Sequence, residues 1–402
     1  MTSESEPDWR ASLSSADRYD NIQAIKTALE QSGLSTSATH QDAFSIENEA
    51  YKTSSSREQY DVACRIPSGR EQPPPAELQS ASAPDEAPEA PEAPEAPESP
   101  GITIGPYQNC HYVASGVTAE VYRSKVTALK VIVETRNIEP HNPFREAKIL
   151  KLLKKPCIPL LDTFRDQEQR FTLAFPFMPS SLEALIKQGP IPVDRIRRHF
   201  RDLFSALSYI HQQGIIHRDV KPSALLLESI DGPAYLSDFG TAWHPELSLY
   251  TEPADQKILD IGTGPYRAPE ALFGDKAYST AVDMWAAGTM LAESCRKSPQ
   301  PLFESRAAHE DGNQLGLILS IFKAIGSPTL ESWPEAAKFK TPPFEMYQVF
   351  AGRTWDDLLP DVEVDFRELI AALVKYNSSN RATASEALQF KCMKDTSDQK
   401  DI

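Results

Sequence analysis

The spacing of apolar residues divides the chain into a polar N-terminal part and a regularly patterned part that begins near residue 104. Alternating apolar and polar positions over 126–133 and 171–175 predict β-strands. Further along, apolar residues recur at helical spacing over 182–186 and 199–211, which predicts helices. Strands followed by helices indicate an α+β fold with a small strand-rich lobe, a larger helical lobe and a cleft between them, where ligands commonly bind.

Residues 1–103 are rich in Ser, Thr, Glu, Asp and Pro, and we expect them to be disordered because so few apolar residues cannot form a core. Residues 85–100 read DEAPEAPEAPEAPESP. Proline at every third position and repeated glutamates favour an extended, solvated acidic spacer. Within 17–32, apolar residues recur at helical spacing, at Tyr19, Ile22, Ile25, Ala28 and Leu29. This segment predicts a short amphipathic helix, which either docks on a folded surface or forms only transiently.

Composition narrows the class of protein. The 402 residues are 40% apolar, and no stretch reaches the about 18 apolar residues of a membrane span. The first residues lack the basic and apolar regions of a secretory signal, and the five cysteines show no metal-binding spacing. We therefore expect free thiols in the nucleus or cytoplasm. A net charge of −16 argues against non-specific nucleic-acid binding and suits a basic protein partner.

Two short motifs carry the chemistry. Residues 217–222 read HRDVKP and residues 238–240 read DFG. Together they place a base, Asp219, about twenty residues before a metal-binding carboxylate, Asp238, with Lys221 beside the base. Any one of these side chains could be an ordinary surface residue, but this joint spacing serves phosphoryl transfer from ATP to a hydroxyl.

With these motifs, residues 104–393 resemble the eukaryotic Ser/Thr protein kinases. The resemblance implies a bilobal kinase fold with an N-lobe at 104–178 and a C-lobe at 179–393, followed by a tail at 394–402. It implies the cofactors ATP and Mg²⁺ and a protein substrate. The lysine two residues after the base favours serine or threonine over tyrosine as the phosphate acceptor.

The resemblance also implies roles for individual residues. Lys130, on a predicted strand, corresponds to the lysine that holds the α- and β-phosphates, and Glu146, on a predicted helix, corresponds to its partner. Asp219 corresponds to the catalytic base and Lys221 to the lysine that steadies the transferred phosphate. Asp238 would bind Mg²⁺, because this hard cation prefers carboxylate oxygen.

The nucleotide loop departs from the family pattern. Residues 114–121 read ASGVTAEV, so only Gly116 of the three family glycines remains. Ala114 and Ala119 each add a Cβ where a glycine would let the backbone approach a phosphate, so we expect a stiffer or more distant loop. The residues expected around adenine are the roof residues Val121 and Ala128, the floor residue Leu226, the bulky Phe175 and the hinge residues Pro176 and Met178.

Ala224 is the most serious departure, because it stands where the family has an asparagine that binds a second metal ion. A methyl group cannot bind a metal or donate a hydrogen bond. Loss of one preorganised polar group typically lowers a rate by about 10²–10³-fold. Two alternatives follow: a kinase that works slowly, or a pseudokinase that serves as a binding module or scaffold.

Downstream residues resemble the cyclin-dependent-kinase-like branch. Residues 266–270 read YRAPE, and Glu270 is expected to pair with Arg381. Asp283 resembles the buried aspartate that braces the catalytic loop, and residues 314–334 resemble the helical insert of that branch.

The segments that regulate these kinases differ here. Residues 139–146 read EPHNPFRE instead of a PSTAIRE-type sequence, so we expect no cyclin to be required. Ile258 stands at the usual activating phosphorylation position, and Asp255 and Asp260 are expected to offer negative charge to Arg218 instead.

Together these departures resemble the single-subunit fungal kinases that phosphorylate the activation threonine of cyclin-dependent kinases in cell-cycle control. We therefore expect a monomeric kinase. Thr263, in the substrate-facing segment, is expected to hydrogen-bond Asp219 and Lys221, as the equivalent threonine of Ser/Thr kinases does.

Overall fold

The computed structural model describes residues 101–116, 118–133, 139–304, 314–344 and 348–394, together with 56–65 and isolated positions before it. The chain forms two compact units, residues 1–93 and 94–402, which are described separately below.

In the first unit, helix α3 (Arg57–Arg65) is not among the predicted elements. Tyr60 and Cys64 lie one turn apart on this helix and are buried with Ile25 and Ala50 in a small apolar cluster. Most of the helix predicted at 17–32 lies outside the described residues, although Asn21 and Ile25 within it are helical.

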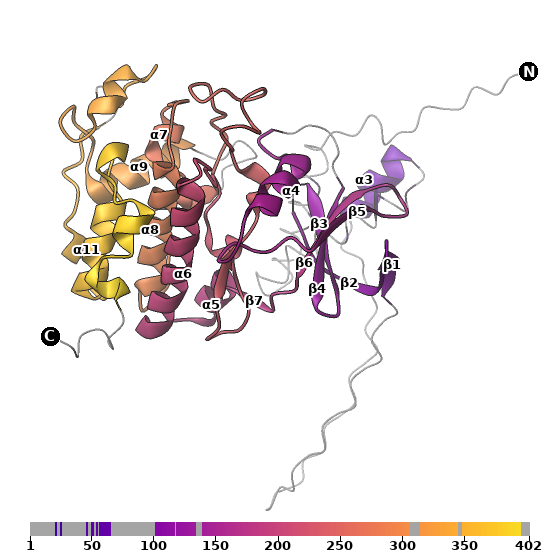
Figure 1. Ribbon diagram of the computed structural model, residues 1–402. Helices are drawn as coiled ribbons and strands as arrows, with labels where there is room; N and C mark the ends of the chain where they lie inside the picture. Colours follow the sequence, from indigo (N-terminus) through magenta and orange to yellow (C-terminus); the bar gives the residue numbers. More distant parts are fainter. Residues whose placement is uncertain are drawn as a thin grey trace, which may run out of the picture. The chain divides into compact units, whose positions relative to one another are not determined.

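The second unit begins with an antiparallel sheet in the order β1-β2-β3-β4-β6-β5 (Figure 1). Its strands are β1 (Ile102–Ile104), β2 (Tyr107–Ser115), β3 (Ala119–Ser124), β4 (Thr127–Ile132), β5 (Asp162–Arg165) and β6 (Phe171–Pro176). Strands β4 and β6 confirm the strands predicted from alternation at 126–133 and 171–175. Leu129 and Val131 are fully buried on one face of β4, while Lys130 between them points to the other face.

Helix α4 (Pro143–Leu152) lies beside this sheet (Figure 1). Asn142 caps it by accepting a hydrogen bond from the Arg145 N–H, and Pro143 occupies the first turn, where a missing N–H costs nothing. The Asn142 N–H also donates to the carbonyl of Gly240 at 3.0 Å. The start of α4, and with it Glu146 in the first turn, is therefore tied to the segment that follows Asp238.

The remainder of the unit is mainly helical, as the apolar periodicity predicts (Figure 1). Its α-helices are α5 (Leu182–Gln188), α6 (Val193–His211), α7 (Pro269–Leu272), α8 (Ala281–Cys295), α9 (Gln314–Ile325), α10 (Trp355–Leu358), α11 (Val364–Leu373) and α12 (Ala384–Ala387). Short 3-10 turns are η2 (Pro222–Ala224), η3 (Phe239–Thr241), η4 (Gly264–Tyr266), η5 (Pro334–Lys338), η6 (Ser378–Asn380) and η7 (Lys391–Met393). A small sheet of β7 (Ser180–Ser181), β8 (Leu225–Leu227) and β9 (Ala234–Leu236) lies at the start of this lobe.

Helix α8 is the centre of the helical lobe, because residues from all of its sides are buried. Within it, Gly288 lies against Leu373 of α11, where an added Cβ would approach the Leu373 Cβ to 2.7 Å. A glycine is required there so that the two helices can pack closely.

A buried ion pair joins Arg381, just before α12, to Glu270 of α7. Both Arg381 Nη atoms donate to the Glu270 carboxylate, at 2.6 and 2.7 Å, and both side chains are at most 1% exposed. The guanidinium also donates to the carbonyls of Lys375, Tyr376 and Ala281. The pairing predicted between Glu270 and Arg381 is therefore present and fully hydrogen-bonded.

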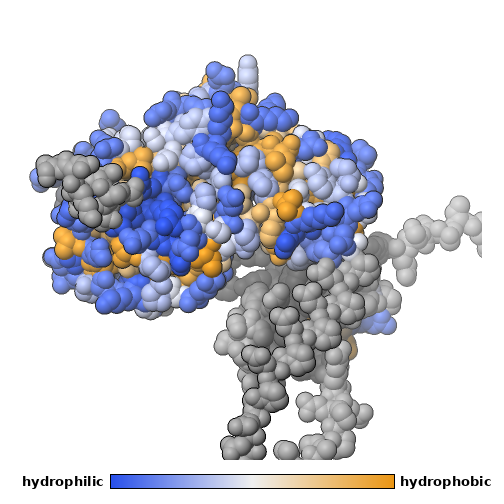
Figure 2. Space-filling view, turned by 60° about the horizontal axis from the view of Figure 1, so that its bottom comes forward, coloured by the Kyte–Doolittle hydropathy of each residue, from blue (hydrophilic) through white to orange (hydrophobic). Residues whose placement is uncertain are grey.

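In the part of the chain that the structure describes, no helix combines the length and apolar character needed to cross a bilayer. The face of the molecule in Figure 2 is mostly hydrophilic, with apolar side chains in scattered patches.

Replacing Arg381 by alanine leaves the Glu270 carboxylate buried without its partner, so we expect Arg381→Ala to lower the free energy of unfolding by about 3–5 kcal/mol. The exposed pair Lys187–Glu183 supplies the control, and Lys187→Ala is expected to change this free energy by at most about 1 kcal/mol. Chemical denaturation of both variants measures the two values. Equal stabilities would contradict the role assigned to the buried pair.

Candidate active site

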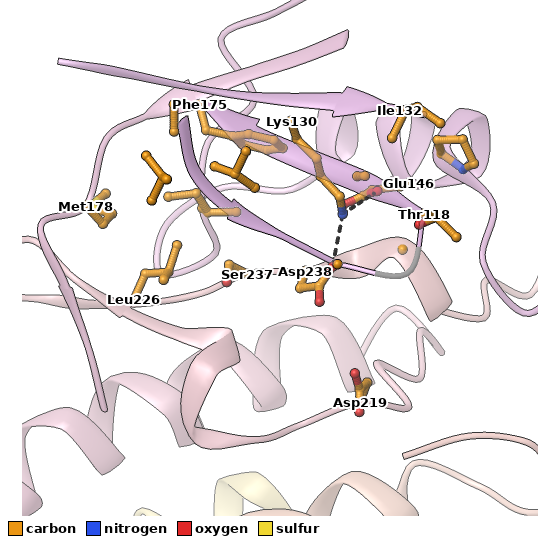
Figure 3. A pocket seen from close by; sticks show the side chains of 18 of the residues that line it. Thr118, Lys130, Ile132, Glu146, Phe175, Met178, Asp219, Leu226, Ser237 and Asp238 are labelled. Atoms are coloured by element: carbon orange, nitrogen blue, oxygen red, sulfur yellow. Dashed lines mark hydrogen bonds and ion pairs between the residues drawn. The ribbon is translucent and has the colours of Figure 1, made fainter. Parts of the chain in front are cut away.

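A cavity of about 450 Å³ lies between the sheet and the helical lobe of the second unit (Figure 3). Strands β3 and β4 form its roof, and the segment just before η2, strand β8 and the segment after β9 form its floor. The predicted site residues that line it are Gly116, Val121, Ala128, Lys130, Glu146, Phe175, Pro176, Met178, Asp219, Lys221, Leu226 and Asp238.

One end of the cavity is apolar. Val121 and Ala128 come from the roof, Leu226 from the floor, and Phe175 pairs with Ala128 across the β4–β6 ladder. Met178 lies at the edge of this end (Figure 3). This composition fits a planar, largely apolar nucleobase.

One loop residue differs from the prediction. Ala114 does not line the cavity, whereas its neighbour Val113 does. Adjacent strand residues point to opposite faces, and the β2–β3 register shifts between Tyr112 and Ala114. The side chain of Val113 therefore faces the cavity and that of Ala114 does not. Gly116 has only the Ala119 carbonyl within 4 Å of where a Cβ would stand, so this part of the loop is open.

Three charged side chains meet at the other end of the cavity (Figure 3). The Lys130 ammonium donates to both carboxylate oxygens of Glu146, at 2.8 and 3.0 Å, and to Asp238 Oδ1 at 3.0 Å. Glu146 is 2% exposed, while the Asp238 side chain is 45% exposed and open to the cavity. A Cβ added to Gly240 would lie 3.5–3.7 Å from all three groups, at ordinary van der Waals distance, so the backbone of Gly240 lies directly against the cluster.

The cluster controls its own protonation. The Lys130 ammonium holds the pKa of Asp238 well below its usual value, so this carboxylate is ionised at neutral pH. Burial alone would lower the pKa of Lys130, but Asp238 and Glu146 raise it above its ordinary value. Burial raises the pKa of Glu146, and the Lys130 charge opposes that effect. A permanently charged lysine and an ionised, cavity-facing aspartate suit a triphosphate and a divalent cation.

The proposed base lies on the floor of the same cavity. Asp219 Oδ2 accepts from the Lys221 ammonium at 2.5 Å, and Oδ1 accepts from the Thr263 hydroxyl at 2.6 Å. Lys221 also donates to Thr263 at 3.2 Å. The network expected of Thr263 is therefore present, although Thr263 itself does not line the cavity.

A buried aspartate braces the loop that carries the base. Asp283 Oδ2 accepts from the His217 N–H at 2.9 Å, and Oδ1 accepts from the Arg218 N–H at 2.8 Å. Arg218 has a positive φ of 72°, a conformation that non-glycine residues rarely adopt, and these hydrogen bonds hold it. The bracing role predicted for Asp283 matches this geometry.

Ala224 is buried at 1% exposure in turn η2. Its carbonyl accepts from the Ser237 N–H and hydroxyl, at 2.8 and 2.9 Å, while the neighbouring Ser223 is exposed. No three His, Cys, Asp or Glu side chains among the described residues are grouped to hold a metal. Asp238 has a carboxylate that is open to the cavity and could bind Mg²⁺ jointly with phosphates, as this ion usually binds in nucleotide sites.

Several cavity residues were not predicted: Val113, Thr118, Ala119, Ile132, His141, Asn142, Pro143, Ile158, Phe177, Ser237 and Gly240. Strand alternation could have found Ile132, which follows Ala128 and Lys130 at every second position of β4. His141 is half-buried, and burial lowers the pKa of its imidazole. Its place in the cavity follows from the hydrogen bond between Asn142 and Gly240, which links segments about 100 residues apart and has no local sequence signal.

The prediction that Asp255 and Asp260 offer negative charge to Arg218 is wrong. Its Nη1 donates to Oε1 of Glu252, and both side chains are buried. Asp260 pairs instead with Arg267, and Asp255 is exposed. Sequence position alone could not distinguish three acids in one segment, because the fold of that segment decides which one is buried.

The arrangement can hold a nucleotide and present its terminal phosphate to an incoming hydroxyl. The apolar end would receive the nucleobase and Lys130 would face the phosphates. Asp219 and Lys221 lie on the side where an acceptor would approach. Such sites catalyse phosphoryl transfer mainly through position and charge.

We expect Glu146→Gln to lower kcat/KM for ATP by about 10–100-fold, because Lys130 would keep only Asp238 as a charged partner and would compete with the cation for it. Lys148→Ala, at an exposed position on the same helix, is the matched control and should be without effect. Steady-state kinetics of both proteins test this, and unchanged kinetics in Glu146→Gln would show that the pair is dispensable.

Comparison with known proteins agrees with this geometry. The family model described as protein kinase domain matches residues 107–393. The serine/threonine-protein kinase csk1 of Schizosaccharomyces pombe is 32% identical over 291 residues, covering 69% of this chain and 91% of that protein. Cyclin-dependent kinase 7 of Carassius auratus is 31% identical over 299 residues, covering 71% of this chain and 82% of that protein.

The serine/threonine-protein kinase CAK1 of Saccharomyces cerevisiae is 30% identical over 280 residues, covering 57% of this chain and 76% of that protein. The match with the family model extends over both lobes and includes every part of the charged cluster. The relatives are serine/threonine kinases, and nothing in these findings supports the pseudokinase alternative. The chain belongs to the protein kinase family, among the serine/threonine kinases related to cyclin-dependent kinases.

Proposed function

We propose that this kinase transfers the γ-phosphate of ATP to the activation-segment threonine of a cyclin-dependent kinase, and that it does so as a single chain without a cyclin. The observation that supports the activity best is the convergence of Lys130, Glu146, Asp219 and Asp238 on one cavity. The substrate class is supported by the likeness to cyclin-dependent kinase 7 of Carassius auratus and to CAK1 of Saccharomyces cerevisiae, together with the resemblance to single-subunit fungal kinases in the sequence. Such a substrate would place the protein in the nucleus or cytoplasm.

The side chains present fit ATP and Mg²⁺. Asp238 would hold the cation, because its carboxylate is ionised and open to the cavity. When bound, the cation neutralises phosphate charge during transfer. Lys130 would hold the nonreacting phosphates, and Phe175 and Met178 would border the base.

The remaining step belongs to the floor of the cavity. The acceptor hydroxyl would donate its hydrogen bond to Asp219, which orients it and receives its proton. As the new oxygen–phosphorus bond forms, the bond from the γ-phosphorus to the bridging oxygen of the β-phosphate would break, and ADP would leave. Lys221, between Asp219 and Thr263, would stabilise the charge on the transferred phosphate.

Independence from a cyclin is supported by contacts that hold α4 from within the chain. Arg145 is 4% exposed and donates to the Glu139 carboxylate at 3.0 and 3.3 Å and to the Pro140 carbonyl at 2.5 Å. Asn142 completes the network by its hydrogen bond to Gly240. These contacts hold the N-terminus of the helix that carries Glu146, and they come from the chain itself, which supports the proposal.

The substrate proposal predicts that the purified chain phosphorylates the activation threonine of cyclin-dependent kinases in the absence of cyclin. A panel of such kinases, each made inactive to remove autophosphorylation, would be incubated with the chain and ATP, and the modified residue located by mass spectrometry. Asp238→Asn is the inactive control. Transfer to general substrates but to no member of the panel would contradict the proposed substrate and leave the kinase activity in place.

The missing asparagine predicts a slow enzyme. We expect Ala224→Asn to raise kcat at least about tenfold by restoring a polar ligand beside Asp238. Ser223→Asn adds the same group at an exposed position and is the matched control. Rates measured over a range of Mg²⁺ concentrations test this. Equal activity of wild type and Ala224→Asn would refute the claim that Ala224 lowers kcat.

A further inference from the structure

We propose that Glu252 is a positioning residue for phosphoryl transfer: its carboxylate pairs with the Arg218 guanidinium and holds the activation segment, residues 238–270, in its working conformation without phosphorylation. The inference rests on the kinase activity proposed above, and not on the identity of the substrate.

The contact is completely buried. Arg218 is 0% and Glu252 1% exposed at their side chains, and Arg218 Nη1 donates to Glu252 Oε1. The same oxygen accepts from the Ile258 N–H at 2.7 Å. Two buried charges are tolerated only when they are paired and hydrogen-bonded, so each requires the other.

Arg218 joins three parts of the site. Arg218 directly precedes the catalytic base Asp219, and its backbone N–H donates to Asp283. Its side-chain Nε donates to the carbonyl of Thr241 at 2.5 Å. Thr241 belongs to turn η3, which begins directly after Asp238. A guanidinium fixed by Glu252 therefore orders the loop of the base and the turn of the metal-binding carboxylate together.

Hydrogen bonds from neighbouring residues fix the backbone of Glu252 and the groups around its ion pair. The indole N–H of Trp243 donates to the Glu252 carbonyl at 3.0 Å, and the Glu252 N–H donates to the carbonyl of Ser248 at 2.8 Å. The Tyr278 hydroxyl accepts from Arg218 at 3.2 Å and donates to the Ile258 carbonyl at 2.7 Å.

A buried lysine closes the other side of this network. Lys257 is 4% exposed, donates to the Tyr278 carbonyl at 2.9 Å, and lies 5.0 Å from the centre of the Trp243 ring. This cation–π contact and the hydrogen bond fix the backbone just before Ile258.

This arrangement makes a covalent modification unnecessary. Phosphorylation orders an activation segment by placing negative charge against an arginine. Here the charge belongs to the chain itself, and Ile258, at the usual modified position, has no hydroxyl. One carboxylate uses only part of the arginine: Arg218 Nη2 and Glu252 Oε2 are buried and lack a hydrogen-bond partner within the described ranges.

The test compares Glu252→Gln with Asp255→Asn, which removes a charge from an exposed position of the same segment. With ATP and myelin basic protein, we expect Glu252→Gln to lower kcat by about 10–100-fold. KM for ATP should change less than threefold, because Glu252 does not line the nucleotide cavity. Asp255→Asn should behave as wild type. Wild-type kcat in Glu252→Gln would overturn the proposal.

Two further arms separate positioning from folding. If Glu252 acts through Arg218, the double variant Arg218→Gln/Glu252→Gln should lose no more activity than Arg218→Gln alone, and additive losses would contradict this. Wild-type protein, shown by mass spectrometry to be unphosphorylated after phosphatase treatment, should keep its full kcat. Loss of activity on that treatment would overturn the proposal even if the variants fail to fold.

Different results would refute the proposed substrate and the proposed role of Glu252. Activity on myelin basic protein without activity on cyclin-dependent kinases would refute the proposed substrate, and the comparison of Glu252 variants would still decide this inference. A wild-type chain that is inactive on both substrates would overturn both proposals.

Discussion

The shared contact of Lys130 with Glu146 and Asp238 is the constraint on which the site depends. The three side chains come from a strand, a helix and a turn that are distant in sequence, and their charges meet within 3.0 Å. Without Glu146, the lysine would neutralise Asp238 and remove the carboxylate that a cation needs. The position of α4 therefore decides whether the cavity can accept a metal-bound nucleotide.

Both segments whose positions are usually set by regulation are held here by the chain's own buried arginines. Arg145 pairs with Glu139 at the start of α4, and Arg218 pairs with Glu252 in the activation segment. Each arginine also donates to a backbone carbonyl, so the ion pairs fix the main chain as well as the side chains. According to the two proposals above, these acids take the place of a partner protein and of a phosphate.

Local patterns predicted much of this structure. Alternation placed β4 and β6, helical spacing placed α5 and α6, and motif spacing led to Lys130 and the residues it meets. The failures concern contacts made at long range. Burial in the folded segment selected Glu252 over Asp255 and Asp260, and a shift in strand register turned Val113 rather than Ala114 toward the cavity. Helix α3 went unpredicted, because its apolar positions are few and its cluster joins separated segments.

The most direct test of the central claim is the transfer of radiolabelled γ-phosphate by the purified single chain, compared with Lys130→Met. The account predicts measurable incorporation by the wild-type chain and loss of incorporation in the variant, which cannot bridge Glu146 and Asp238. Equal incorporation by the two proteins would contradict it, because the charged cluster would then be unnecessary for the reaction.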